Sequence, residues 1–445
     1  CTEQFRAMYL SVFYTLILQV NPFHIGILML ITKIWDAVND PIIGAIVDSR
    51  KATKGGKFIP WIRAFSFPMA VLCILGFVNV SNLAYGLRLA YMFVTYVLYE
   101  ALYTCVNVPF GTLSSVMTDD VRHRTALSRY RSLGGTIFMT VIVMVGPLVL
   151  YVDNKPVAGR FLMLASVFAL IGLLCLQITC VWCKERVAVP ERPKGEKLNY
   201  LHVIKEIAKN KALLGVMFFS LVGMIGASVV NGLNTYLFKD YFGNVKIMAV
   251  SGGLSVLYSL ITFAITQPLA DKLGKKEWCC WGAGFAAAVF ALLFFFPIHN
   301  PVLFIVINGV CYLGASGMQV LIWAMVNDSI DYHELQTGER NEGIVYSTYS
   351  FFRKLASAVS GSLSSFVLGF IGYNVAEGAM QTAEVSNAIW KSYTGIYVLG
   401  YGVAVAILFF VYPLTKAKTT EMLEQLKARR AEKASAVEKD GEQCP

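Results

Sequence analysis

Charged residues are scarce in this chain of 445 residues: they make up 15% of the sequence, whereas hydrophobic residues make up 56%. An average soluble domain has about 25% charged residues, so a single soluble fold could not hide this much apolar surface. Histidine is also rare, and all five histidines lie at predicted helix ends or in loops, where no Ser-His-Asp triad or metal set converges. These shortages exclude disorder and a soluble domain, and they argue against an enzyme.

Long apolar segments are abundant instead. A helix needs roughly 20 apolar residues to cross a bilayer. Twelve segments qualify, at about 2–20, 24–48, 60–79, 87–117, 126–151, 159–183, 211–238, 247–271, 277–297, 301–330, 343–372 and 391–414. They predict an all-α polytopic protein with twelve transmembrane helices, the first of which is truncated. The net charge of +10 is spread over short basic runs between these segments and not on one face, so nucleic acid is not an expected partner.

The positions of the basic residues predict the orientation in the membrane. With the N-terminus inside, the inner loops and the tail hold 27 of the 38 Lys and Arg residues, and the outer loops hold six. The positive-inside rule then places both termini in the cytoplasm. We therefore expect a multi-pass protein of the plasma membrane (an inner membrane in a bacterium).

A polar stretch divides the chain into two sets of six predicted helices. The expected parts are an N-terminal bundle at 1–184, a cytoplasmic linker at 185–210, a C-terminal bundle at 211–414 and a charged cytoplasmic tail at 415–445. A similar turn, Gly-x-x-x-Asp48 and Pro-x-x-Asp271, follows the second helix of each set. It resembles the loop signature of the major facilitator superfamily, which implies two bundles with a binding site between them. One chain supplies all twelve helices, so a functional monomer is expected.

Three charges and an amide lie close together in the second predicted span. At 100° per residue, Lys33, Asp36 and Asp40 fall within about 80° of one another, with Asn39 at the edge of that face. Each charge costs about 2.5–3.5 kcal/mol at mid-bilayer, so this face must look into a polar cavity. Carboxylate and amide oxygens favour a site for a hard cation such as Na⁺. The alternative is an internal Lys33–Asp36 ion pair, which leaves Asp40 unexplained.

Polar side chains also occur in the fourth and eleventh predicted spans. Thr104 and Asn107 share a helical face beside Pro109, which frees a backbone carbonyl. These residues suit a ligand site, and hydrogen bonding between helices is an equal alternative. In the eleventh span Lys354 needs a buried partner, either an acid of the second span or a sugar hydroxyl.

An acidic stripe ends the tenth predicted span. Asp328, Asp331 and Glu334 recur every three residues, and Arg122 and Arg124 follow the fourth span at the same depth. Ion pairs between these two sets would close the inner side of the cavity. The alternative is a solvated loop face.

Three motifs resemble those of the glycoside–pentoside–hexuronide:cation symporters. They are Asp36-Ala-Val-Asn39-Asp40-Pro41, Gly56-Lys57-Phe58-Ile-Pro60-Trp61, and the segment from Asp328 through Tyr332, Gly338 and Arg340 to Gly343. The resemblance spans nearly the whole chain and implies the major facilitator fold. The resemblance implies that the cation ligands correspond to Asp36, Asn39, Asp40 and Thr104. The central lysine falls on Lys354 and a sugar-contacting tyrosine on Tyr103. The cytoplasmic gate falls on Arg124, Asp328, Asp331, Glu334 and Arg340.

The sugar-binding positions depart from the family pattern. Asn107 stands where the family has its main sugar-binding aspartate, and Gln319 stands where it has a tryptophan, with Trp323 one turn away. The expected substrate-binding set is therefore Tyr103, Asn107, Lys354, Gln319, Trp323 and Arg6. Within it, Arg6 is a candidate ligand for an anionic sugar such as a uronide. The alternative is a structural pair of Arg6 with Glu3 or Glu100.

These residues predict a secondary active transporter. It would import a sugar or glycoside, with a uronide or a pentoside as candidates, together with Na⁺ or H⁺, by alternating access. No cofactor is expected other than the coupling ion. One alternative is cation-coupled transport of an amphipathic lipid-like or drug-like substrate. A second is a membrane sensor that does not transport.

Overall fold

The computed structural model describes residues 2–49, 56–118, 121–186, 210–337, 349, 352–353, 356, 360, 362–376 and 380–441. Inside some of these helices the side chains lie outside the described part, among them those of Asp40, Arg122 and Arg124. The first helices are α1 (Thr2–Leu16), α2 (Pro22–Ser49), α3 (Ile59–Leu75), α4 (Tyr85–Met117), α5 (Val121–Leu150) and α6 (Ala158–Trp182). The later ones are α8 (Lys211–Tyr236), α9 (Ile247–Leu273), α10 (Lys275–Phe295), α11 (Pro301–Ala315), α12 (Gly317–Thr337), α14 (Ala383–Phe410) and α15 (Lys416–Gly441). A π-helical turn, η1 (Leu237–Tyr241), follows α8, and residues 362–370 are also helical.

Eight helical segments in the described part of the chain are long and apolar enough to cross a membrane. They include α4, α6, α10 and α14 over most or all of their lengths, and α11 and α12 together as one segment. Many of their large apolar side chains are exposed in the isolated protein, such as Phe263, Phe295 and Phe410. This distribution fits helices whose outer faces contact lipid.

The chain forms two compact units that do not follow chain order. Unit 1 contains Cys1–Lys194, Val229–Gly253 and Gly361–Ser392, and unit 2 contains Gly195–Ser228, Leu254–Ser360 and Tyr393–Pro445. Helices α8, α9 and α14 each contribute one end to each unit. The boundaries expected at 184, 210 and 414 stay a prediction.

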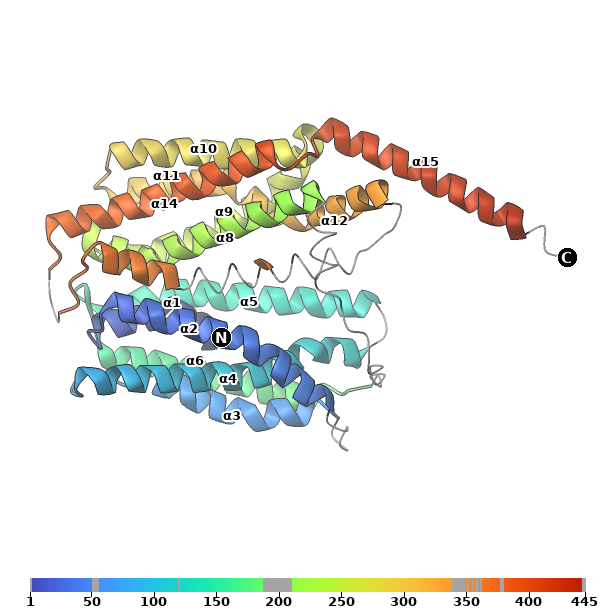
Figure 1. Ribbon diagram of the computed structural model, residues 1–445. Coiled ribbons are helices and arrows are strands. Elements are labelled where there is room, and N and C mark those ends of the chain that lie inside the picture. The colour runs from blue at the N-terminus through green and yellow to red at the C-terminus, as the bar shows by residue number, and fades with distance from the viewer. Residues whose placement is uncertain are drawn as a thin grey trace. The chain divides into compact units, whose positions relative to one another are not determined.

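In unit 1, α1–α6 run alongside one another (Figure 1). The closest packing joins α3 to α4 and α6, and α2 to α4. Apolar side chains of α3 and α4, including Ile62, Met69 and Tyr99, form a continuous buried core. Helix α4 continues through Pro109 without ending there. This packing places the polar face of α2 against the middle of α4, where the predicted cation ligands lie.

One of the three sequence motifs is explained by the capping of α3. The Glu185 carboxylate, which follows α6, accepts hydrogen bonds from the backbone amides of Lys57, Phe58 and Ile59 at 2.7–2.9 Å. These amides lie at the start of a helix, where backbone N–H groups have no partner within the helix. Gly56 adopts φ +100°, and a Cβ there would collide with the Glu185 carboxylate. The glycine is therefore required at this position.

A short hairpin joins α5 to α6 in unit 1. Strands β1 (Tyr151–Val152) and β2 (Lys155–Pro156) pair antiparallel. Between them, Asp153 and Asn154 have φ values of 47° and 62°. Two positive φ angles in a two-residue loop are typical of a type I′ turn, in which Asp and Asn are favoured. The turn projects the Asn154 amide away from the strands.

Unit 2 has its own apolar core, which α8, α10, α12 and α14 share. Asn210 begins α8: its Oδ1 accepts from the backbone amide of Leu213 at 2.9 Å, and its Nδ2 donates to the Ser329 carbonyl of α12 at 3.0 Å. The charged helix α15 is anchored by Met422 and Leu426, which are buried in this core. Part of the tail thus packs on protein, where the sequence predicts a solvated or membrane-surface helix.

Candidate functional site

A lysine and two acids form an ion cluster inside unit 1. The Nζ atom of Lys33 on α2 lies 3.2 Å from Oδ2 of Asp36 and 3.6 Å from Oε2 of Glu100 on α4. Glu100 is 2% exposed, and the Lys33 and Asp36 side chains are each 22% exposed. We call Lys33, Asp36 and Glu100 the buried ion cluster. Its three formal charges sum to −1, before Asp40 is counted. Arg6 and Glu3, one charge of each sign, also interact electrostatically with its members, so counting them leaves the sum unchanged.

The predicted cation ligands flank this cluster. Asn39 and Thr104 are both buried, on α2 and α4 respectively. Thr104 is one helical turn beyond Glu100, on the same face of α4. Oδ1 of Asp36 and Nδ2 of Asn39 are buried without a hydrogen-bond partner. Asp40 belongs to the same helix, but its side chain lies outside the described part. Three of the four predicted ligands thus lie on two helices that pack against each other, and their joint coordination of a cation stays a prediction.

The sugar-binding residues predicted on α4 follow the same face toward its C-terminal end. Tyr103 and Asn107 are half-buried. The ring of Tyr103 stacks on that of Tyr99, with centroids 6.1 Å apart and planes 13° apart. This stacking fixes the direction of the Tyr103 hydroxyl. A phenol and an amide next to the ion cluster provide donors and acceptors suitable for sugar hydroxyls.

Arg6 occupies a different environment from the one expected for a substrate ligand. It is 2% exposed, and its guanidinium carbon lies 3.6 Å from the ring centre of Tyr99 and 5.2 Å from that of Tyr96. Its three nitrogens have no hydrogen-bond partner. A Cβ at Gly76, the residue after α3, would lie 2.8 Å from an Arg6 nitrogen. This geometry favours a structural role inside the bundle, where the rings hold the cation.

The predicted residues of unit 2 have partners within that unit. Oδ1 and Oδ2 of Asp328 each lie 2.7 Å from Nζ of Lys275 at the start of α10. Asp331 and Glu334 continue the same helix at intermediate burial.

Among the substrate-binding residues predicted in unit 2, Trp323 packs on Tyr349. The guanidinium carbon of Arg353 lies 5.9 Å from the centre of the Trp323 ring. Gln319 is exposed. Lys354, Arg340 and the Arg124 side chain lie outside the described residues, so the gate and the central lysine stay predictions.

A second polar region of unit 1 surrounds the β1–β2 hairpin. Asn154 donates to the Lys239 carbonyl and accepts from the Val245 amide, both at 2.9 Å. Asp240 bonds to Lys239 Nζ at 2.6 Å and accepts from the Tyr373 hydroxyl at 2.8 Å. Ser386 donates to the Asp240 carbonyl at 3.1 Å. We call Asn154, Lys239, Asp240, Tyr373 and Ser386 the hairpin network.

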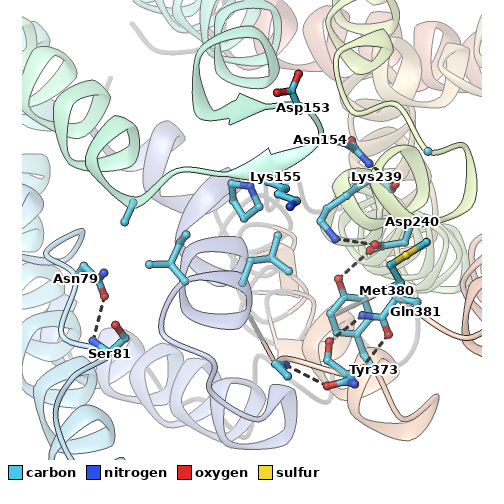
Figure 2. A pocket seen from close by; sticks show the side chains of 17 residues that line it. Asn79, Ser81, Asp153, Asn154, Lys155, Lys239, Asp240, Tyr373, Met380 and Gln381 are labelled. Atoms are coloured by element: carbon cyan, nitrogen blue, oxygen red, sulfur yellow. Dashed lines mark hydrogen bonds and ion pairs between the residues drawn. The ribbon is translucent and has the colours of Figure 1, made fainter. Parts of the chain in front are cut away.

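The hairpin network borders a cavity of about 610 Å³. Figure 2 shows Lys239 and Tyr373 both directed at Asp240, with Lys155 of the hairpin nearby. The sequence did not indicate these residues, because they come from a hairpin turn, from η1, from the segment after the helix at 362–370 and from the start of α14. The Asp153-Asn154 pair, whose residue types are favoured in a type I′ turn, is the one signal that could have indicated the hairpin.

The structure gives partners to two charges that the sequence singled out. Glu100, which the sequence offered with Glu3 as an alternative partner of Arg6, forms an ion pair with Lys33. Asp328 pairs with Lys275, and its predicted ion pairs with Arg122 and Arg124, whose side chains lie outside the described part, stay a prediction. Within the described part of the chain, no group of three or more His, Cys, Asp and Glu side chains is arranged to hold a metal ion. The donors at α2–α4 are instead the hard oxygens of two acids, an amide and a hydroxyl.

Comparison with known proteins gives consistent results. The family model described as "MFS/sugar transport protein" matches residues 4–416. An uncharacterized symporter, YjmB of Bacillus subtilis, is 31% identical over 94% of this chain and 90% of its own length. The isoprimeverose transporter of Lactiplantibacillus pentosus is 29% identical, over 95% and 88%. A glucuronide carrier protein homolog of Escherichia coli is 25% identical, over 95% and 92%.

Solved structures agree on the fold. A bacterial homolog of the lysosomal transporter Spinster, in an inward-facing conformation, has a TM-score of 0.66 at 12% identity, over 92% of this chain and 95% of that chain. At this identity the likeness concerns the fold alone. Together with the family match it confirms the predicted all-α major facilitator fold.

Proposed function

The chain belongs to the family of MFS/sugar transport proteins, and we propose that it imports a glycoside together with a cation bound between α2 and α4. It is a multi-pass membrane transporter and not an enzyme. Na⁺ is the proposed coupling ion, because carboxylate, amide and hydroxyl oxygens are the ligands that hard cations prefer.

The observation that carries this proposal is the charge imbalance of the buried ion cluster. Each buried charge costs about 2.5–3.5 kcal/mol in a membrane, and a structural ion pair needs one acid for one lysine. Here Lys33 faces two acids, and an oxygen of Asp36 has no partner. A bound cation would neutralise the excess charge and occupy the open oxygen.

The substrate is proposed to bind next to this cation, at Tyr103 and Asn107. Cation binding reduces the local negative field, and filling both sites favours closure around the substrate. A membrane potential then contributes about 2.3 kcal/mol per charge per 100 mV to uptake. Two relatives are named for isoprimeverose and for glucuronides. Arg6 is buried against tyrosine rings and is therefore not the expected ligand of an acidic sugar. We propose a neutral glycoside as the main candidate substrate and a uronide as the second candidate.

Uptake into proteoliposomes tests the proposal. Purified protein would be given labelled pentose-containing glycosides, hexosides and uronides under an inward Na⁺ gradient, an inward H⁺ gradient or no gradient. We expect accumulation of one neutral glycoside class that requires the Na⁺ gradient. Equal uptake without any gradient would contradict coupling, and accumulation of an amphipathic compound in place of all sugars would contradict the substrate class.

A further inference from the structure

The ammonium of Lys33 lies between two acids that play different parts in the proposed function. Asp36 is a predicted cation ligand whose Oδ1 accepts no hydrogen bond from a donor group. Glu100 is outside the predicted ligand set, and its carboxyl group lies within hydrogen-bonding reach of that of Asp36. The Nζ atom is 3.2 Å from Asp36 and 3.6 Å from Glu100. Lys33 therefore occupies part of the coordination shell that an arriving cation needs.

We propose that Glu100 is the exchange partner of Lys33: when a cation binds at Asp36, the ammonium leaves Asp36 and pairs with Glu100 alone. This inference rests on the proposed function and specifies how its cation site is filled. In the empty site Lys33 takes the place of the coupling ion. In the filled site Glu100 retains the displaced ammonium within the bundle.

Charge balance explains why a second acid is needed. A monovalent cation at Asp36 repels the neighbouring ammonium, and a buried ammonium without a partner is unfavourable. Glu100 is almost fully buried, and its Oε2 makes no hydrogen bond. That oxygen is therefore available to accept a closer contact from Lys33.

The geometry permits the exchange with a small movement. Lysine has a flexible four-carbon stem and three rotatable donors, so a change of torsion angles shortens the 3.6 Å separation to Glu100 while opening Asp36. Lys33 and Asp36 are one turn apart on α2, and Glu100 approaches from α4. No helix has to shift for Lys33 to change partners.

The exchange makes Lys33 a tethered competitor of the coupling cation. The cation affinity then depends on the free energy needed to move the Lys33 ammonium away from Asp36, and Glu100 lowers this free energy by accepting the ammonium. This role differs from direct ligation. A ligand acts on the cation whether or not Lys33 is present, whereas an exchange partner acts only through Lys33.

A double-mutant cycle distinguishes these roles without knowledge of the substrate. The melting temperature of the purified full chain is measured at pH 7.5 while Na⁺ replaces choline at constant ionic strength, and the half-saturating Na⁺ concentration is read from the shift. The variants are Glu100→Gln, Lys33→Met and the double variant. Glu100→Asp retains the carboxylate. Glu3→Gln is the matched control, because Glu3 is a half-buried acid that interacts electrostatically with Lys33 and is outside the buried ion cluster.

We expect Glu100→Gln to raise the half-saturating Na⁺ concentration about tenfold, equivalent to ~1.4 kcal/mol, because Asp36 is then the one acid left in an ion pair with Lys33 among the described side chains. Lys33→Met should lower it about tenfold, since the competitor is gone. In the Lys33→Met background, adding Glu100→Gln should change it less than twofold. Glu100→Asp should raise it only about threefold, and Glu3→Gln less than twofold.

Three results would overturn the exchange. An equal effect of Glu100→Gln with and without Lys33 would make Glu100 a direct ligand, and no effect in either background would make it structural. If Glu100→Gln does not fold, Glu100→Asp can be measured alone and together with Lys33→Met. This gives the same comparison with a smaller expected change in the half-saturating Na⁺ concentration. Wild-type protein that shows no Na⁺-dependent shift would overturn the exchange and the Na⁺ site together. A normal shift without glycoside uptake would overturn the proposed function alone.

Discussion

Unit 1 contains two groups of polar side chains that differ in how completely they are paired. In the hairpin network, Asn154 uses both its donor and its acceptor, and the two carboxylate oxygens of Asp240 have separate partners. In the buried ion cluster, oxygens of Asp36 and Glu100 have no hydrogen bond. A fully paired group is typical of a structural element, because its polar atoms gain nothing further from a ligand. The unpaired oxygens of the ion cluster point to a binding site.

The largest expected effect is that of Asp36→Asn, which removes the charge at the open site. The amide keeps the shape of the side chain but cannot balance a cation, so sodium-driven glycoside uptake should fall on the order of 100-fold. Uptake by proteoliposomes under a Na⁺ gradient measures this loss. The matched change in the hairpin network, Asp240→Asn, should leave the Na⁺ concentration for half-maximal uptake unchanged. Loss of Na⁺ dependence in both variants would contradict the distinction between the two groups.

Asp240→Asn should act on stability instead. The substitution leaves Lys239 without its counter-charge and weakens the bond from Tyr373, so we expect a loss of about 2 kcal/mol in the free energy of unfolding. Thermal unfolding of the detergent-purified protein measures it, with Asp240→Glu as the variant that keeps the charge. An unchanged melting temperature would show that the hairpin network does not stabilise unit 1.

The sequence predicted these two groups unequally, for a physical reason. The arrangement of Lys33, Asp36 and Asn39 follows from helical periodicity, which one segment reveals on its own. Partners on different helices do not follow from periodicity. The sequence left Glu3 and Glu100 as alternative partners of Arg6 and did not identify Lys33 as the partner of Glu100 or Lys275 as a partner of Asp328. Charge alone does not select among several oppositely charged residues.

The same distinction applies to the fold: features that depend on one segment could be predicted, and contacts between distant segments could not. Apolar length indicated the membrane helices, and the capping of α3 by Glu185 explains why the Gly56-Lys57-Phe58 motif stands where it does. The hairpin network could not be predicted, because its members come from three separate stretches of the chain that only the folded structure brings together.

Arg6→Met tests a third environment, in which a buried charge has no hydrogen bonds but does have aromatic contacts. Arg6 has no hydrogen bonds but is held over two tyrosine rings. Removing this cation–π contact from a desolvated site should cost about 2 kcal/mol of stability. Uptake of neutral and acidic glycosides should decrease to the same extent, by less than threefold. A selective loss of uronide uptake would instead make Arg6 a substrate ligand.

The smallest expected effect is that of Tyr373→Phe, which removes one bond of the hairpin network and keeps the edge-to-face packing of the ring on Tyr236. We expect a loss of about 1 kcal/mol. Burial, and then the Asp240 carboxylate, raise the pKa of Tyr373, so the phenol stays a donor to the carboxylate. A tyrosine with a raised folded-state pKa contributes its full stability below its ordinary pKa of about 10 and loses it only as the pH rises through the raised value. The difference in melting temperature between wild type and Tyr373→Phe should therefore be constant from pH 6 to 9. A difference that disappears within this range would show that Tyr373 does not donate to Asp240.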